Sequence, residues 1–408
     1  MYDFAAMGAW IEFAVRWLHV ITGIAWIGSS FYFIALDLGL HRDRNLASGA
    51  DGEEWQVHGG GFYHIQKYLV APDNMPDGLI WHKWQSYWTW ISGFILLVLV
   101  YYLGAEFYLI DPAIADLAVW QAVGISLASL AFGWVVYNTL CRVFVDANQT
   151  TLMVALFGVL VAMSYFYTSV FSGRAAMLHL GAFTATIMSA NVFMVIIPNQ
   201  KIVVADLMAG RVPDAKYGKI AKQRSTHNNY LTLPVIFLML SNHYPLAFAT
   251  EFTWLIASLV FLMGVTIRHY FNSMHARKGN PHWTWAVTTL IFILIMWLST
   301  APMFRAEEPE TAQGNAALKF ARIDGFSEVQ DIVLGRCSMC HAAEPVWDGL
   351  HWPPKGVRLE TEYQIAKQAR EIYLQSGVSH AMPPANLSYM EAEERALIVA
   401  WYRAATEE

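Results

Sequence analysis

The sequence predicts an all-α membrane protein, in which eight transmembrane helices form a bundle and a small α-helical domain follows. Of the 408 residues, 56% are hydrophobic and only 14% are charged, and the apolar residues occur in long runs. A run of about 17 to 25 mostly apolar residues is long enough to cross the hydrocarbon core as a helix. The strands of a transmembrane barrel are shorter and alternate in hydrophobicity, so helices are the expected spanning elements.

The expected spans leave the last quarter of the chain outside the membrane. The sixth span is the weakest, because its clean apolar run covers only residues 231–240 and the polar residues Asn242 and His243 follow. A broken or re-entrant helix is therefore a second interpretation there. The eight spans cover residues 11–36, 84–105, 117–138, 150–171, 176–198, 229–248, 251–271 and 284–304. The predicted domains are a membrane domain (1–304), a polar acidic linker (305–317) and a small C-terminal domain (318–408).

Lysine and arginine residues gather in the connections on one side of the predicted bundle. The connection 37–83 holds four of them and 199–228 holds six, whereas 106–116 holds none and 172–175 holds only Arg174. Cytoplasmic loops carry the excess of basic residues in membrane proteins. Both termini of this multi-pass chain are therefore expected on the outer side of the lipid bilayer.

The most specific short motif is a C-x-x-C-H sequence that runs from Cys337 to His341 in the C-terminal domain. Thiols at this spacing, Cys337 and Cys340, can form thioether bonds to a haem, and the histidine can then bind the iron. A zinc knuckle or a redox dithiol is the alternative, but the third of the three cysteines, Cys141, lies in a distant apolar segment. We therefore predict one covalent haem c, a cofactor typical of electron transfer.

The other axial ligand of the iron is expected downstream in the same domain, where a methionine would raise the reduction potential. Met382 is the first candidate, because Pro383 and Pro384 fix the backbone beside it. Met390 is the second candidate, although packing is the simpler role for it. Met339 lies between the two cysteines and cannot reach the far face of a haem. The predicted iron ligands are thus His341 and Met382.

The last helix of this domain is expected to start at a capping box formed by Ser388 and Glu391. Together with a helix before the cysteines, this arrangement resembles a class I cytochrome c domain over residues 318–408. From residue 306 onwards the chain carries nine basic and sixteen acidic residues. The negative surface either steers a basic electron acceptor or is an ordinary solvated surface, and we expect no nucleic-acid partner.

Ionisable residues share one face of the first span. Glu12, Arg16, His19 and Trp26 are separated by four, three and seven residues, so they lie on one side of a helix. Ionisable side chains at membrane depth are costly and usually face a site or the interior of a bundle. The stripe can bind an anion or hold a haem b, with Glu12 neutralising Arg16. A structural ion pair beside a hydrogen-bonded histidine is the alternative.

Further polar groups occur near the ends of other spans. His179 and His243 are expected on the same side of the membrane as His19, where two histidines from different helices can hold a haem b. At the start of the sixth span, His227, Asn228 and Asn229 can bind a flat polar ligand. Helix capping and solvation at the membrane interface explain part of that cluster equally well.

The long first connection, 37–83, is expected to be irregular. It contains His41, His58 and His64, and the glycines at 59–61 indicate flexibility. A lid over a site and a solvated loop are both possible interpretations of this segment, and the solvated loop is preferred.

Two membrane segments resemble those of a known family. The first span reads WLHVITGIAWIGSSFYF, and the region around the sixth span reads QRSTHNNYLTLPVIFLMLSNHYP. In a chain of eight spans fused to a cytochrome c, they resemble the membrane-bound urate oxidases of bacteria over essentially the whole length. The resemblance implies oxidation of urate to 5-hydroxyisourate in purine breakdown, in the bacterial inner membrane. It also implies that electrons pass to the fused periplasmic cytochrome.

The residues are compatible with that implication. Urate is a planar anion at neutral pH, and Arg16, Trp26, Asn228 and Asn229 offer a cation, an aromatic wall and hydrogen-bonding groups. A soluble or membrane-bound acceptor of the respiratory chain would then receive the electrons. Two alternatives remain open: a haem-dependent quinol or porphyrinogen dehydrogenase, and a redox sensor or transporter that carries a cytochrome.

Overall fold

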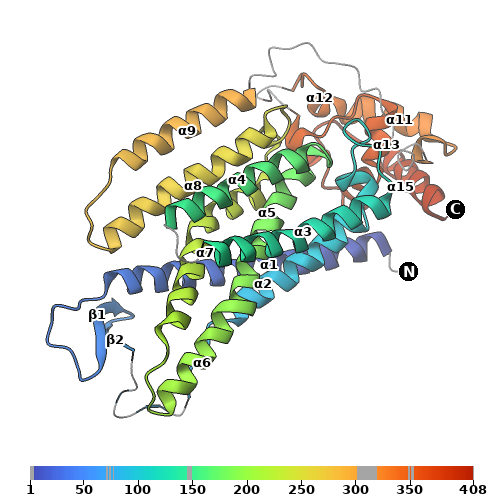
Figure 1. Ribbon diagram of the computed structural model, residues 1–408. Coiled ribbons are helices and arrows are strands. Elements are labelled where there is room, and N and C mark those ends of the chain that lie inside the picture. Colours follow the sequence, from blue (N-terminus) through green and yellow to red (C-terminus); the bar gives the residue numbers. More distant parts are fainter. Residues whose placement is uncertain are drawn as a thin grey trace.

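The structure is a computed structural model, and it describes residues 4–69, 72, 75–76, 78–144, 149–300, 319–347, 350 and 353–407. It is mostly helical, with a long helical bundle and a small helical domain at one end (Figure 1). The bundle contains α1 (Phe4–Gly39), α2 (Trp84–Leu96), η1 (Leu97–Tyr102), η2 (Ala105–Leu109), α3 (Val119–Val143), α4 (Gln149–Thr168), α5 (Gly173–Asn191), η3 (Val192–Ile196), α6 (Ile197–Met208), α7 (Ala215–Ser241), η4 (Pro245–Ala247), α8 (Thr253–His275) and α9 (Trp283–Thr300).

Six helices among the described residues are long and apolar enough to cross a membrane. They are Ala6–Gly39, Val119–Val143, Gln149–Thr168, Gly173–Met208, Thr253–His275 and Trp283–Thr300. The expected spans at 84–105 and 229–248 also coincide with helices, but these two helices are not both long enough and apolar enough to count as candidate membrane spans. The α-helical part of α2 is short and continues as the π-helical segment η1, and α7 has a polar first half. A mostly helical fold with membrane-length helices is thus confirmed.

The sixth expected span differs from its prediction in position. Helix α7 begins at Ala215, well before residue 229, because the side chain of Asp214 accepts a hydrogen bond from the Lys216 amide at 2.9 Å and caps it. The helix is continuous to Ser241 and includes Pro234, so it is neither broken nor re-entrant in its clean apolar part. Gly264 of α8 gives the Pro234 ring the space that it needs.

The first connection contains a β-hairpin, which the prediction of an irregular loop missed. Strands β1 (Ala50–His58) and β2 (Gly61–Tyr68) pair antiparallel. Gly59 and Gly60 form the turn with φ angles of 61° and 81°, a conformation that favours glycine at both positions of a two-residue hairpin. These glycines therefore define a turn and do not make a loose loop.

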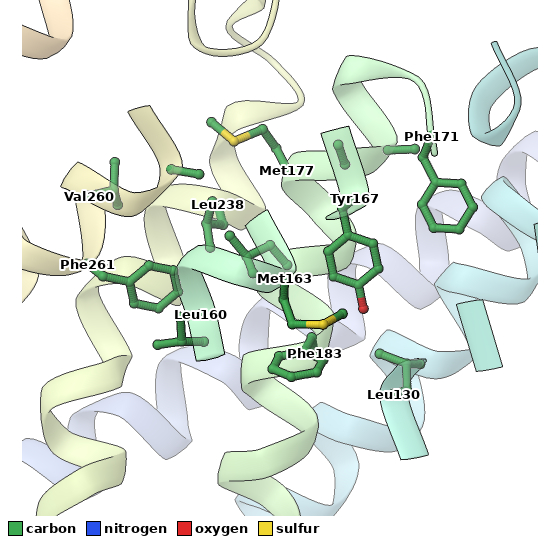
Figure 2. Close-up of a cluster of buried hydrophobic side chains, with 14 of the residues drawn as sticks. Leu130, Leu160, Met163, Tyr167, Phe171, Met177, Phe183, Leu238, Val260 and Phe261 are labelled. Carbon is green, nitrogen blue, oxygen red and sulfur yellow. The ribbon is translucent and has the colours of Figure 1, made fainter. Parts of the chain in front are cut away.

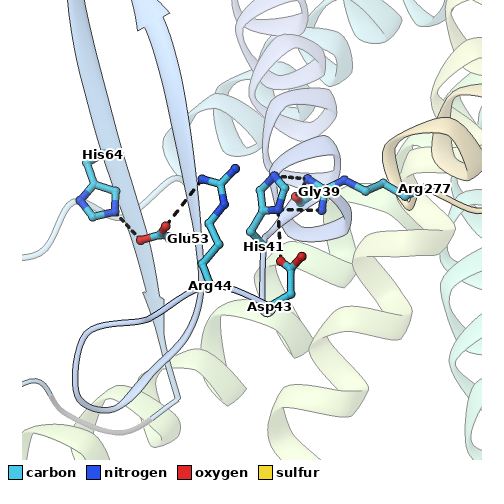
Figure 3. Close-up of polar contacts among 7 residues, drawn as sticks. All are labelled: Gly39, His41, Asp43, Arg44, Glu53, His64 and Arg277. Atoms are coloured by element: carbon cyan, nitrogen blue, oxygen red, sulfur yellow. Dashed lines mark hydrogen bonds and ion pairs between the residues drawn. The ribbon is translucent and has the colours of Figure 1, made fainter.

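Polar contacts join the two strands of the hairpin and tie the segment before it to the end of the bundle (Figure 3). The His64 ring lies 2.8 Å from Glu53 and stacks on Trp55, and Arg277 contacts both His41 and the Gly39 carbonyl oxygen. The hairpin, whose strands carry His58 and His64, lies at the end opposite to the small domain (Figure 1). It is therefore no lid over a site beside that domain.

Buried side chains of the central helices form the core of the bundle. Leu160, Met163 and Tyr167 of α4 meet Phe183 of α5 and Leu238 of α7 (Figure 2). Each of them exposes at most 7% of its surface. Close approach between helices matters here: a side chain at Gly133 of α3 would collide with the Phe183 ring. Helices α4, α5, α7 and α8 thus form the rigid centre around which the others pack.

The small domain packs on one end of the bundle. It consists of α11 (Phe326–Arg336), α12 (Ser338–His341), η6 (Pro354–Gly356), α13 (Glu362–Lys367), α14 (Ala369–Ile372), η7 (Tyr373–Val378), η8 (Pro384–Asn386) and α15 (Ala392–Glu407). Phe107 of the bundle lies against the Phe320 ring, with centroids 6.4 Å apart, and Tyr108 donates a hydrogen bond to Glu371. This is the end where the sequence places the basic-poor connections.

The start of the last helix also differs from its prediction. Helix α15 begins at Ala392, and the Glu394 side chain accepts a hydrogen bond from the Glu391 amide at 2.7 Å. The hydroxyl of Ser388 is buried without a hydrogen-bond partner among the described residues. The capping box at Ser388 is therefore wrong, because Tyr389 adopts a left-handed conformation with φ of 56°.

The contact between Gly264 and Pro234 predicts the effect of a single methyl group. Gly264→Ala should lower the free energy of unfolding by about 1–3 kcal/mol, because the new side chain must displace the proline ring in a packed core. Gly158→Ala on α4 is the matched control, since nothing lies within 4 Å of the added carbon. Thermal unfolding in detergent measures both, and equal melting temperatures would contradict this account of the α7–α8 contact.

Candidate functional site

The predicted ligands of a covalent haem meet in one crevice of the small domain. Cys337, Cys340, His341 and Met382 all line a cavity of about 560 Å³. Helix α12 carries the second cysteine and the histidine, and η8 follows directly after Met382 and Pro383. Residues that are about 40 positions apart in the sequence thus face one hollow, as thioether attachment and two axial ligands would require.

Hydrogen bonds orient both candidate iron ligands. The Nδ1 atom of His341 lies 2.9 Å from the Val357 carbonyl oxygen, so this nitrogen carries the proton and Nε2 is the free ligand atom. The Met382 amide donates to Gln375 at 2.8 Å, and its carbonyl oxygen accepts from Arg395 at 2.9 Å. Met390, in contrast, is 3% exposed and belongs to the core of the domain. The structure therefore fits Met382 and gives Met390 a packing role.

The two cysteines do not have the properties of a redox dithiol. Burial raises the pKa of the Cys337 thiol to about 12 and also raises the pKa of Cys340. Redox-active and zinc-binding cysteines have lowered pKa values, because the thiolate is the reactive form. Among the described residues, no three histidine, cysteine or acidic side chains gather as a metal site would need. Because of their raised pKa values, both thiols are protonated at neutral pH in this structure.

A second, smaller cavity lies within the bundle. It has a volume of about 220 Å³. Four of the predicted residues line it, namely Arg16, His19 and Trp26 of α1, and His243, which follows α7. The first-span stripe therefore does face an internal space, and His243 reaches the same space from a different part of the chain.

The stripe is held in place by contacts within the bundle. The His19 Nδ1 atom lies 3.0 Å from the Thr89 carbonyl oxygen and 3.1 Å from the Ser92 hydroxyl. The His19 ring passes so close to α2 that any side chain at Gly93 would collide with it. Arg16 pairs with Glu12 at 2.5 Å, while 43% of the Arg16 side chain stays exposed. Arg16 thus retains surface for a further contact.

Three polar residues that the sequence analysis missed complete this cavity. Tyr101, Arg174 and Ser189 line it, and the Arg174 Nε and the Ser189 hydroxyl are buried without a hydrogen-bond partner among the described residues. The buried Tyr101 hydroxyl faces the side chain of Arg174. Tyr101 exposes 3% of its surface and Ser189 1%. A buried polar group that lacks a partner costs roughly 1–3 kcal/mol, so such a set in one cavity indicates a polar ligand.

The cavity also has an aromatic wall. Trp90 and Phe94 of α2 line it together with Trp26. The Trp90 and Phe94 rings stack on each other, with centroids 5.4 Å apart. Two guanidinium groups, unpartnered donors and flat apolar rings suit a small, planar and anionic molecule. The signal that could have revealed Arg174 was its isolation as the one basic residue in the connection 172–175.

His179 lies just outside the cavity, with its ring centroid 5.7 Å from that of Tyr101, which lines the cavity. It is completely buried, and both of its ring nitrogens have partners, with Nδ1 2.8 Å from the Ala175 carbonyl oxygen and Nε2 2.9 Å from the Ser126 hydroxyl. The cavity lining includes His19 and His243 but not His179. The structure therefore does not bring the three histidines together.

The polar cluster on α7 faces a separate network. His227 lies 2.8 Å from the Tyr137 hydroxyl, and Asn228 accepts a hydrogen bond from Asn191 at 2.9 Å. Asn229 accepts from Arg268 at 3.2 Å on another side of the helix. None of the three α7 residues lines the membrane cavity. Consecutive residues on a helix point in different directions, so this cluster does not join Arg16 and Trp26 in one site.

Comparison with known proteins identifies the membrane domain. The family described as urate oxidase N-terminal matches residues 5–299, which is well over half of the chain. No curated protein and no solved structure shows a significant match. The matched region contains every residue that lines the membrane cavity and ends before the small domain. The chain belongs to the urate oxidase N-terminal family.

Proposed function

We propose that this protein oxidises urate to 5-hydroxyisourate in the membrane cavity and passes the electrons to a haem c in the crevice of the small domain. The observation that carries the proposal is the set of unpartnered buried polar atoms beside two arginines in that cavity. Family membership supports urate as the substrate. The C-x-x-C-H motif and the shape of the crevice support the electron acceptor.

The residues of the cavity match the chemistry of urate. Arg16 and Arg174 supply positive charge to a monoanion, and the Tyr101 and Ser189 hydroxyls can bond to its carbonyl oxygens and ring nitrogens. The Trp90 ring can lie against a flat purine. The cavity has less than half the volume of the crevice that suits a haem. A purine therefore suits this space better than a haem b. His19 and His243, which both line the cavity, are the candidate ligands for a haem b.

The reaction needs both a proton acceptor and an electron acceptor. Urate and one water give 5-hydroxyisourate, two protons and two electrons. Because the Thr89 carbonyl oxygen accepts a hydrogen bond from the His19 Nδ1 atom, Nε2 is the basic nitrogen of this ring and can take a proton. A haem c held by Cys337, Cys340, His341 and Met382 would supply one-electron chemistry, so two transfers would be needed for each urate.

The distribution of charge supports a location in the bacterial inner membrane. Basic residues gather at the end of the bundle that carries the hairpin, and the small domain lies at the other end (Figure 1). By the positive-inside rule the small domain is periplasmic, where haem is joined to C-x-x-C-H sequences in bacteria. A respiratory-chain acceptor in or near the periplasm then receives the electrons.

Removing a cavity arginine should weaken substrate binding. Arg174→Gln and Arg16→Gln should each raise the Kd for urate about tenfold or more, since a hydrogen bond to a charged group contributes about 1.5–3 kcal/mol. Arg142→Gln is the control, because Arg142 is exposed on α3 and does not line the cavity. Isothermal titration with urate measures the three variants. Parental affinity in both cavity variants would place the urate site elsewhere.

Removing the proposed base should stop the chemistry more than the binding. His19→Ala should abolish urate-dependent reduction of haem c, whereas the urate Kd should change by less than for the arginine variants, because His19 holds a proton and not the anion. Stopped-flow absorbance follows the reduction, and quinol in place of urate tests the quinol dehydrogenase alternative. Reduction at the parental rate would make His19 a scaffold residue.

The axial ligand can be tested by its absorption band. Met382→Ala should retain the covalent haem but lose the long-wavelength band of the bond between iron and sulfur, because this methionine lines the same crevice as the C-x-x-C-H motif. Met339→Leu is the control, since Met339 also lines the crevice but lies between the cysteines. A band that survives in Met382→Ala would exclude Met382 as the ligand.

A further inference from the structure

We propose that Tyr108 fastens the small domain over the membrane cavity and thereby sets the rate at which the haem in that domain is reduced. That the electrons come from urate in the membrane cavity rests on the proposed function. That Tyr108 holds the two domains together rests on its contacts in the structure. Tyr108 is a positioning residue in this proposal, because it lines neither cavity.

Tyr108 contacts one lining residue of each cavity. Its hydroxyl donates a hydrogen bond to Glu371 Oε1 at 3.0 Å, and Glu371 lines the crevice of the small domain. On the other side, the guanidinium carbon of Arg174 lies 5.1 Å from the centroid of the Tyr108 ring, and Arg174 lines the membrane cavity. A single side chain thus connects the proposed donor site with the proposed acceptor site.

The segment that carries Tyr108 is fixed to the bundle. Tyr108 lies in η2, and its carbonyl oxygen accepts a hydrogen bond from the Ser172 hydroxyl at 2.7 Å. Ser172 is the N-cap residue of α5, a helix of the rigid centre. Phe107, the preceding residue, packs against the core of the small domain. The backbone is therefore held by the bundle, while the side chains reach into the other domain.

The bond between Tyr108 and Glu371 is of a strong type. A hydroxyl that donates to a carboxylate makes a charge-assisted hydrogen bond. Glu371 also accepts a hydrogen bond from Arg370 at 3.0 Å, which holds this carboxylate in place. The side chains of Arg370 and Glu371 are each about one-third exposed. The contact between Tyr108 and Glu371 can therefore break without unfolding either domain. Such a bond can control docking without being part of either core.

Docking matters because electron transfer slows steeply with distance. A small domain that leaves the bundle carries its haem away from the cavity, and the observed rate then scales with the docked fraction. Losing one charge-assisted hydrogen bond shifts that fraction toward the undocked form. The expected result is a slower first reduction of haem c with unchanged substrate binding.

The test compares Tyr108→Phe with Tyr102→Phe in the full-length holoprotein. Tyr102 is a matched control because its hydroxyl lies 2.8 Å from Ser126 inside the bundle and does not contact the small domain. Four quantities are measured: urate affinity, haem c reduction by saturating urate, haem c reduction by dithionite, and hydrogen–deuterium exchange in segments 105–109 and 369–378.

Tyr108→Phe should reduce haem c with urate about tenfold more slowly, which corresponds to about 1.4 kcal/mol. Urate affinity, the haem spectrum and reduction by dithionite should stay parental, and exchange should rise in both segments. Glu371→Leu should raise exchange equally, and the double variant should add nothing, since both remove the same bond. Tyr102→Phe should leave all four quantities unchanged.

Two outcomes would overturn the inference. One is parental exchange and a parental reduction rate in Tyr108→Phe. The other is an equal loss in Tyr102→Phe, which would indicate a general effect of removing a hydroxyl. If urate fails to reduce the haem of the parental protein, the proposed function fails instead. The exchange data then still decide whether Tyr108 fastens the domain.

Discussion

A polar side chain inside an apolar bundle must find its partners in the protein, because the surroundings offer no water. Most of the arrangement follows from this constraint. Asn191 donates to both Tyr137 and Asn228, and Asn228 in turn donates to the Met188 carbonyl oxygen. Exceptions occur both beside the membrane cavity, at Arg174 Nε and the Ser189 hydroxyl, and in the α7 network, at His227 Nε2 and Asn229 Nδ2, where buried atoms have no partner among the described residues. A polar molecule bound in the cavity would satisfy the first two.

Features that depend on local sequence could be predicted. Long apolar runs gave helices at all eight expected positions, because helical hydrogen bonds are made within a segment. The spacing of Arg16, His19 and Trp26 predicted a shared face, and all three line one cavity. Met382 and the C-x-x-C-H motif likewise reached one crevice. For both the first-span stripe and the candidate haem ligands, few residue types have the required chemistry, so few positions in the sequence had to be considered.

Features that depend on the packing of distant segments could not be predicted. Tyr101 comes from η1, whereas Arg174 and Ser189 come from the two ends of α5, and only the folded bundle brings η1 and α5 together. The same packing separates His227 from the first-span stripe. The hairpin at 50–68 was missed because its turn glycines also suit a loose loop. Helix α7 started early because a cap at Asp214 compensates for its polar first half.

Carrying the electron acceptor on the same chain has a consequence for the kinetics of the proposed reaction. The contact between Tyr108 and Glu371 is made within one chain, so its effective concentration does not depend on the number of molecules in the membrane. Each cavity then always has one acceptor within reach, at a stoichiometry that expression levels cannot change. In the proposed reaction the first electron would leave by a unimolecular step, and only onward transfer from a bound haem would depend on meeting another protein.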